Sequence, residues 1–207
     1  MKRLSFAALV ALCCLTFSMT ASQARANSVG DARKFVDTIA TQALNVISGK
    51  DSKEQKELKL EKLFSGSVDI PWVGRFTLGR YWREATEDQR SRYLKEYENF
   101  WVTHYAGRFA EYSGGSFTIT GASQDDDGQY IVNMVMVSAE DHQDVQVEYH
   151  VHMDAANQFK IYDVVIEGVS MITTQRSEFA SVVASKGLDY LIDQLASRSL
   201  EVSSPKS

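Results

Sequence analysis

Residues 145–153 read VQVEYHVHM, and this stretch decides the fold class. Its apolar side chains occupy every second position from Val145 to Met153, and the positions between them are polar. A period of two is typical of a β-strand that buries one face and exposes the other. The stretch therefore predicts a half-buried strand.

Three more strands are predicted nearby, at residues 116–120, 130–137 and 159–166. The second is apolar at nearly every position, which predicts that both of its faces are covered. Polar turns at 125–128 and 154–158 separate the strands. Such short links join antiparallel neighbours, so we expect an antiparallel sheet.

Helices are predicted before these strands. Ser28 is expected to cap the first one, which carries an apolar stripe and ends at Gly49. A charged helix should follow over residues 52–64, and Pro71 marks the start of a short third helix.

The clearest helix start is the capping box Thr86-Glu87-Asp88-Gln89, which opens a long aromatic helix. After the strands, a helix over residues 173–185 should end at Gly187, and a last short helix should follow. The pattern predicts an α+β fold in which helices wrap a curved antiparallel sheet.

The first residues resemble an export signal. Lys2 and Arg3 precede an apolar run over residues 4–17, and Ala24-Arg25-Ala26 supplies a small-x-small cleavage site. We expect residues 1–26 to form a secretory signal peptide and residues 27–207 to form a single domain.

Cleavage changes the charge balance of the chain. Without Lys2, Arg3 and Arg25, the 22 basic residues fall to 19 against 27 acidic ones, a formal charge of −8. Such an acidic protein is a poor candidate for nucleic-acid binding. Both cysteines, Cys13 and Cys14, leave with the signal, so no disulfide or thiolate metal site is expected.

Motifs for familiar chemistry are missing or broken. The sequence contains no glycine-rich loop for a dinucleotide and no G-x-x-x-x-G-K-[ST] loop for a nucleoside triphosphate. Gly168-Val169-Ser170 begins like a nucleophile elbow, but Ile172 replaces its second glycine, so we expect Ser170 to lie at a strand-to-helix junction. Asp125 and Asp127 resemble the start of a calcium loop without its later ligands, and predict a solvated turn.

Two groups of polar residues have alternative interpretations. Glu148, His150 and His152 share one face of a strand and are spaced closely enough to ligate a metal, but the wet side of a half-buried strand is favoured and no metal is expected. The basic side chains around the capping box fit an anionic head group or an acidic partner, or are simply exposed helical charges. They are Arg75, Arg80, Arg83, Arg90, Arg92 and Lys95.

Two longer stretches carry a family resemblance. Residues 76–86 read FTLGRYWREAT and residues 162–179 read YDVVIEGVSMITTQRSEF. Together with the signal peptide and the length, they resemble the MlaC family of periplasmic phospholipid-binding proteins, also called toluene-tolerance auxiliary transport proteins. The resemblance extends over essentially the whole mature chain.

The resemblance implies an NTF2-like α+β fold around a deep apolar cavity, without a cofactor. It implies a periplasmic carrier, expected to be a monomer, that binds glycerophospholipid. Its implied partners are an outer-membrane lipoprotein complex and an inner-membrane ABC transporter with an MCE-domain subunit. The implied role is to maintain outer-membrane lipid asymmetry without enzymatic activity.

Such a cavity must enclose both acyl chains of a lipid. At roughly 0.8 kcal/mol per methylene, about 30 methylenes have a transfer free energy from water of about 24 kcal/mol. A shallow groove would leave much of the acyl chains in contact with water, so most of this free energy would not be gained. Strand parity and helical faces predict the lipid-contacting side chains. They are Leu78, Trp82, Tyr97, Phe100, Tyr105, Val132, Met134, Val147, Tyr149, Val151, Ile161, Val169 and Met171.

Two other functions remain open at this point. NTF2-like cavities also hold small isomerases and dehydratases, for which Asp163 and His150 would be the natural acid–base pair. A binding module that senses a lipophilic solute is the third hypothesis.

Overall fold

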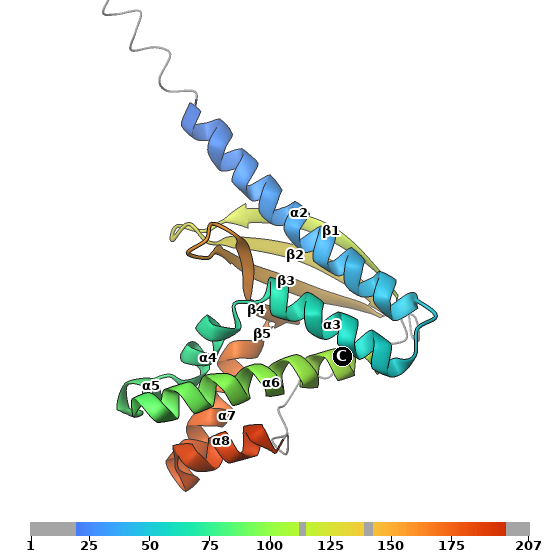
Figure 1. Ribbon diagram of the computed structural model, residues 1–207. Coiled ribbons are helices and arrows are strands. Elements are labelled where there is room, and N and C mark those ends of the chain that lie inside the picture. The colour runs from blue at the N-terminus through green and yellow to red at the C-terminus, as the bar shows by residue number, and fades with distance from the viewer. Residues whose placement is uncertain (1–19, 112–114, 139–142, 198–207) are drawn as a thin grey trace, which may run out of the picture.

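The computed structural model describes residues 20–111, 115–138 and 143–197. Its sheet has five strands in the order β1-β2-β3-β4-β5, and each strand pairs antiparallel with the next. Helices precede and follow the sheet in the chain (Figure 1). The expected α+β class, with helices around a curved antiparallel sheet, is therefore confirmed. The strands are β1 (Gly115–Gln124), β2 (Tyr130–Ser138), β3 (Asp144–Met153), β4 (Phe159–Ile166) and β5 (Val169–Ser170).

The helices form two groups about the sheet. The long helix α2 lies along the sheet and packs on β1 and β2, and α3 packs beside it; the helices α4 to α8 lie below the sheet in the view of Figure 1. Among the described residues, no helix combines the length and the apolar character needed to cross a membrane. The helices are α2 (Thr20–Ser48), α3 (Lys53–Ser67), α4 (Ile70–Leu78), α5 (Tyr81–Glu84), α6 (Glu87–Glu111), α7 (Met171–Lys186) and α8 (Leu188–Ala196).

Side-chain caps fix where several helices begin. Ser52 and Gln55 form a reciprocal capping box at α3, and Asp69 accepts a hydrogen bond from the Trp72 amide at 3.0 Å at the start of α4. Ser170 caps α7, as its predicted position at a strand-to-helix junction requires. The caps satisfy backbone amides that lack partners within their own helix.

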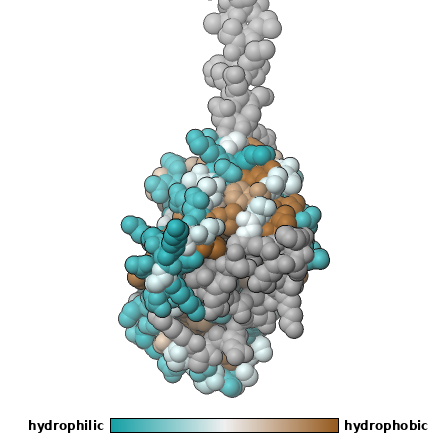
Figure 2. Space-filling model, turned by 90° about the vertical axis from the view of Figure 1, so that its right-hand side faces the viewer, coloured by the Kyte–Doolittle hydropathy of each residue, from teal (hydrophilic) through white to brown (hydrophobic). Residues whose placement is uncertain are grey.

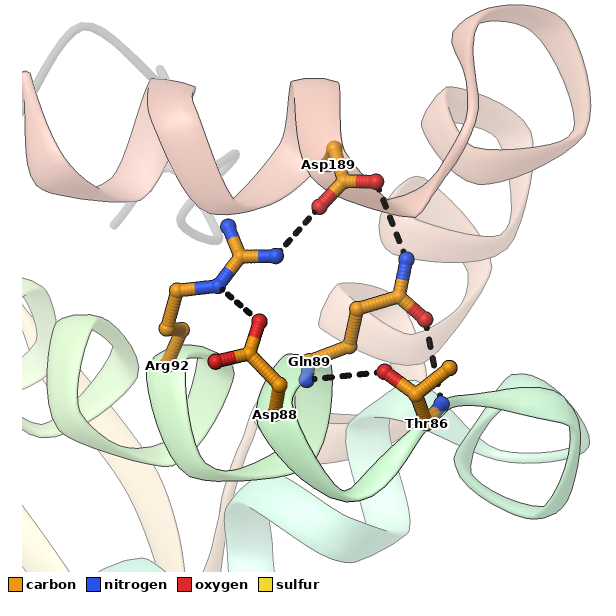
Figure 3. A network of polar contacts seen from close by, with 5 residues as sticks. All are labelled: Thr86, Asp88, Gln89, Arg92 and Asp189. Atoms are coloured by element: carbon orange, nitrogen blue, oxygen red, sulfur yellow. Dashed lines mark hydrogen bonds and ion pairs between the residues drawn. The ribbon is translucent and has the colours of Figure 1, made fainter.

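The capping box predicted at Thr86 is present and also joins two helices (Figure 3). The Gln89 amide donates to Thr86 Oγ1 at 3.2 Å, while Gln89 Oε1 accepts from the Thr86 amide at 3.1 Å. Gln89 Nε2 then donates to Asp189 of α8 at 2.9 Å. Arg92 bridges Asp88 and the same Asp189 at 2.8 and 2.7 Å. Hydrogen bonds from Arg92 and Gln89 lower the pKa of Asp189.

Two details of the predicted fold are wrong. Ser28 does not start the first helix, because α2 already begins at Thr20. Residues 20–27 contain three alanines and neither proline nor glycine, so the helix already includes the residues before Ser28. The second face of β2 is half-buried rather than covered: Ile131, Val135 and Val137 all retain some exposure.

The main core lies between the sheet and the helices. Val132, Met134, Val147 and Val151 project from the inner face of the sheet and are almost fully buried. On the helical side, aromatic rings of α6 and α7 fill the interior. Tyr93 stacks on Tyr97 with centroids 5.6 Å apart, and Phe179 meets both rings edge-on.

Candidate functional site

A cavity lies where α2, the sheet and α7 meet. Its volume is about 140 Å³. Most of its wall is aliphatic or aromatic, and Asp163 is the single charged residue among the described residues that line it. The lining residues are Val36, Ile39, Ala40, Ala43, Phe64, Ser67, Val68, Val73, Trp101, Tyr105, Tyr149, Ile161, Tyr162, Asp163, Val164, Ile166, Met171, Ile172 and Gln175.

Small side chains on α2 help to keep this space open. Ala40 and Ala43 face the cavity at a position where the helix passes the sheet. A larger aliphatic residue at either position would project into the space, because well-packed interiors leave few voids. Met171 at the start of α7 lines the cavity nearby, and its flexible thioether adapts to different neighbours.

A second, smaller cavity adjoins the first. Its volume is about 30 Å³, and it lies between the C-terminal part of α2 and strands β1 and β2. Ala40, Ala43 and Tyr149 line both cavities. These three side chains therefore form the wall that divides one apolar space from the other.

Tyr149 is the largest side chain in this dividing wall. It projects from β3, and burial raises the pKa of its hydroxyl to about 12. The phenol therefore stays neutral at any physiological pH. An uncharged aromatic wall is compatible with an apolar ligand on either side of it.

A bulge in β4 brings residues of both parities to the cavity. The register shifts between His150 and Val151, so that Val151 pairs with Ile161 while Tyr149 pairs with Val164. Ile161 and Val164 consequently both line the cavity, although strict alternation would place them on opposite faces. Sequence parity alone selects Ile161 and misses Val164.

Asp163 is buried in the cavity wall, but its oxygens already have partners. It accepts hydrogen bonds from the amides of Val164 at 2.8 Å and Ile172 at 3.2 Å, and from the Ser170 hydroxyl at 2.6 Å. These contacts tie β4 to the first turn of α7. The arrangement gives Asp163 a structural role in positioning that helix.

The predicted lipid-contact residues divide into three groups. Tyr105, Tyr149, Ile161 and Met171 line the larger cavity, and Met134 lines the smaller one with Tyr149. Trp82 is half-buried at the edge of the core, and Val169 is 45% exposed. The remaining residues are buried in the core without lining either cavity: Leu78, Tyr97, Phe100, Val132, Val147 and Val151.

The cavity also contains residues that sequence reasoning missed. The α2 positions Val36, Ile39 and Ala40 belong to the apolar stripe of the first helix, but nothing in the sequence shows which partner this stripe faces. Gln175 is a buried polar residue of α7 and is hidden among other polar residues in the sequence.

The alternative acid–base pair occupies opposite positions of β3 and β4, because His150 pairs with Asp163 in the sheet, but only Asp163 lines the cavity. His150 packs against the Tyr162 ring with centroids 5.8 Å apart and lies 3.5 Å from Glu148. His152 instead pairs with Asp69 at 2.9 Å. Within the described ranges, no three His, Cys, Asp or Glu side chains are grouped closely enough to hold a metal ion.

The basic residues near the capping box are largely engaged within their own region. Arg90 donates to the Trp82 carbonyl at 2.8 Å, Arg80 donates to the Tyr81 hydroxyl at 2.8 Å, and Arg92 bridges two carboxylates. These contacts agree with the interpretation of exposed helical charges.

Apolar side chains also reach the surface. Figure 2 shows the face seen at the right of Figure 1, where the C-terminal end of α2 lies. Hydrophobic residues gather in its upper half, at the level of α2 and the sheet, and hydrophilic residues border them. The smaller cavity lies at this same end of α2, which includes Leu44 and Ile47.

Comparison with known proteins decides the family. The family model described as MlaC protein matches residues 37–197, most of the chain and all of the strands. The chain belongs to the MlaC family. This confirms the resemblance carried by residues 76–86 and 162–179.

The chain is also similar to two individual proteins. The intermembrane phospholipid transport system binding protein MlaC of Haemophilus influenzae is 20% identical over 192 residues, covering 87% of this chain and 89% of the relative. A solved phospholipid-binding protein from Ralstonia solanacearum, in complex with a phospholipid, shares the fold with a TM-score of 0.68. That match has 21% identity and covers 81% of this chain and 96% of the other.

Proposed function

We propose that this MlaC-family protein is a periplasmic carrier of glycerophospholipid and performs no chemistry on it. Its partners would be an outer-membrane lipoprotein complex and an inner-membrane ABC transporter with an MCE-domain subunit. This exchange would maintain outer-membrane lipid asymmetry. The observation that carries the proposal is the apolar cavity enclosed by α2, the sheet and α7. The names of the two relatives support the lipid class.

The size of the cavity adds a requirement to this proposal. Its volume of about 140 Å³ is below the roughly 300–1,000 Å³ of ordinary small-molecule pockets. Two acyl chains therefore fit only if the walls move apart. The smaller cavity across Tyr149 lies where such a movement would add space at once.

Transfer by such a carrier needs no internal energy source. Acyl chains inside a protein and inside a bilayer are both removed from water, so their exchange is close to balanced. The sequence has no G-x-x-x-x-G-K-[ST] loop that would bind a nucleoside triphosphate. The direction of transfer must then be set by the partners that load and unload the carrier.

A cavity-filling variant tests the proposal. Ala40→Trp places a large side chain in the space shared by both cavities, and we expect lipid uptake from liposomes to fall by about tenfold or more. Thr41→Trp is the matched control, because Thr41 is exposed on the same helix. Uptake is measured by mass spectrometry of protein separated from the liposomes, and folding by circular dichroism. Equal uptake by folded Ala40→Trp and its control would contradict the proposal.

A further inference from the structure

Gln175 carries a buried donor that its protein surroundings leave unused. The side chain lies one turn into α7, is 2% exposed and lines the larger cavity. Its Oε1 accepts a hydrogen bond from the Tyr97 hydroxyl at 2.6 Å. Its Nε2 has no hydrogen-bond acceptor among the described residues. Buried polar groups in folded proteins nearly always have a hydrogen-bond partner, so we expect this nitrogen to bind an acceptor from outside the chain.

We propose that Gln175 Nε2 donates a hydrogen bond to an acyl ester carbonyl of the bound phospholipid. This inference rests on the proposed function, because it assumes that the cavity receives such a lipid. An ester carbonyl is a neutral acceptor whose burial costs far less than that of a charged group, and one donor is enough to satisfy it. The bond would fix how deeply the glycerol part of the lipid sits.

The charge of the cavity wall favours an ester carbonyl of the phospholipid over its phosphate oxygens as the acceptor. Phosphate oxygens are anionic and need cationic or multiple donors when they leave water. Among the described lining residues there is no Lys, Arg or His, and the charged residue present is the carboxylate of Asp163. A phosphate would therefore be repelled here, while a neutral carbonyl would not.

Tyr97 holds the Gln175 amide in the required orientation. It is fully buried in α6, and burial raises the pKa of its hydroxyl, so the group remains protonated. The hydroxyl can therefore donate to Gln175 Oε1 at any physiological pH, which turns Nε2 away from Tyr97. Asp163 lines the same cavity but is not an acceptor for this nitrogen in the structure; its oxygens accept from Ser170 and from the amides of Val164 and Ile172.

Diester and diether phospholipids test the proposal directly. The two probes share the head group and alkyl lengths and differ in the ester carbonyls. Delipidated wild-type protein is offered both, and the bound ratio is measured by mass spectrometry. We expect the diester to be bound in preference by about fivefold, because this ratio of affinities corresponds to the net free energy of one ordinary hydrogen bond. Gln175→Met keeps the length of the side chain without its amide, and should bind both probes equally.

A second pair of variants keeps the test valid if Gln175→Met folds poorly. Tyr97→Phe retains the Gln175 amide, and Tyr97→Phe/Gln175→Met removes both hydrogen-bond partners, so no buried group is orphaned. The diester preference should be reduced but not lost in the single variant, because the amide loses the hydroxyl that orients it, and should vanish in the double one. Using the ratio within each variant cancels general changes in affinity, and thermal unfolding confirms folding.

The outcomes distinguish this inference from the proposed function. Wild-type protein that binds both probes equally would overturn the inference alone, since Nε2 would then serve no ester. A preference that survives Gln175→Met would also overturn it. Wild-type protein that binds neither probe would overturn the proposed function and, with it, the inference.

Discussion

At the scale of single residues, tyrosines in the core and at the cavity wall make the stability of the protein depend on pH. Burial raises the pKa values of Tyr93, Tyr97, Tyr149 and Tyr162 above that of a free phenol. A free tyrosine titrates near about 10. The folded state therefore resists ionisation of these groups more strongly than the unfolded chain does.

This shift predicts alkaline destabilisation. Below pH about 10 the tyrosines are neutral in both the folded and the unfolded state, and their contribution to the free energy of unfolding is fully present. This contribution is lost as the pH rises from about 10 through the folded pKa values near 12. In Tyr149→Phe the free energy of unfolding should fall less over this range, by up to about 2 kcal/mol. Urea unfolding of both proteins at several alkaline pH values measures the difference. Identical pH profiles would show that Tyr149 is not buried as described.

Asp163 gives a second prediction at this scale. Asp163→Ala leaves the buried Ile172 amide without its acceptor and leaves the Ser170 hydroxyl with Thr173 Oγ1 alone, so we expect a loss of about 2–4 kcal/mol in unfolding free energy. Ser170→Ala removes one of these donors and the cap of α7, and should cost about 1 kcal/mol. Urea unfolding measures both. An unchanged stability in Asp163→Ala would argue against the structural role and reopen a chemical one.

At the scale of elements, we expect α2 to be the wall that separates from the sheet. Phe35 packs on Phe159 of β4 with ring centroids 5.9 Å apart, and Arg33 donates to the Ile119 carbonyl of β1 at 3.1 Å. These contacts hold the helix against the strands. The cavity-lining alanines lie on the same helix.

Loosening this wall should accelerate lipid entry. Phe35→Ala removes the aromatic contact, and we expect about 1–3 kcal/mol of destabilisation together with faster uptake of a fluorescent phospholipid from vesicles. Stopped-flow fluorescence gives the rate. Asp37→Ala, an exposed position on α2, is the control. Slower uptake by folded Phe35→Ala would place the entrance elsewhere.

Much of the element order follows from local sequence signals. The alternation in residues 145–153, the polar turns and the box at Thr86 and Gln89 all depend on neighbours in the chain, and all are present. The predicted helix start at Ser28 is wrong, because a cap residue marks the start of a helix only when the residues before it are not helical. That condition depends on residues 20–27, which favour continuation.

The cavity is less accessible to sequence reasoning than the fold. Parity identifies the inner face of β3, but the bulge opposite His150 reverses parity along β4 and brings Val164 inward. Helical spacing marks Val36 and Ala40 as one stripe, yet not which element this stripe meets. A void is the space that side chains from distant segments leave unfilled, so its position depends on the assembled packing.

At the scale of the whole molecule, the central question is how the cavity can hold both acyl chains of a lipid. A cavity of about 140 Å³ is small beside two acyl chains, whose burial is worth about 24 kcal/mol. Relative to water, that free energy exceeds the cost of separating packed walls, which breaks a limited set of apolar contacts. In exchange with a bilayer, where the chains are already out of water, the contacts that the lipid makes in the opened cavity must offset that cost. The carrier is therefore expected to be compact when empty and expanded when loaded.

Mass spectrometry of the protein isolated under mild conditions from a bacterial periplasm tests this account most directly. We expect glycerophospholipid to be released in a fixed ratio to the protein, and to be absent from the Ala40→Trp variant prepared in the same way. A wild-type protein that carries no lipid and takes up none from liposomes would contradict the claim that this interior opens to hold one.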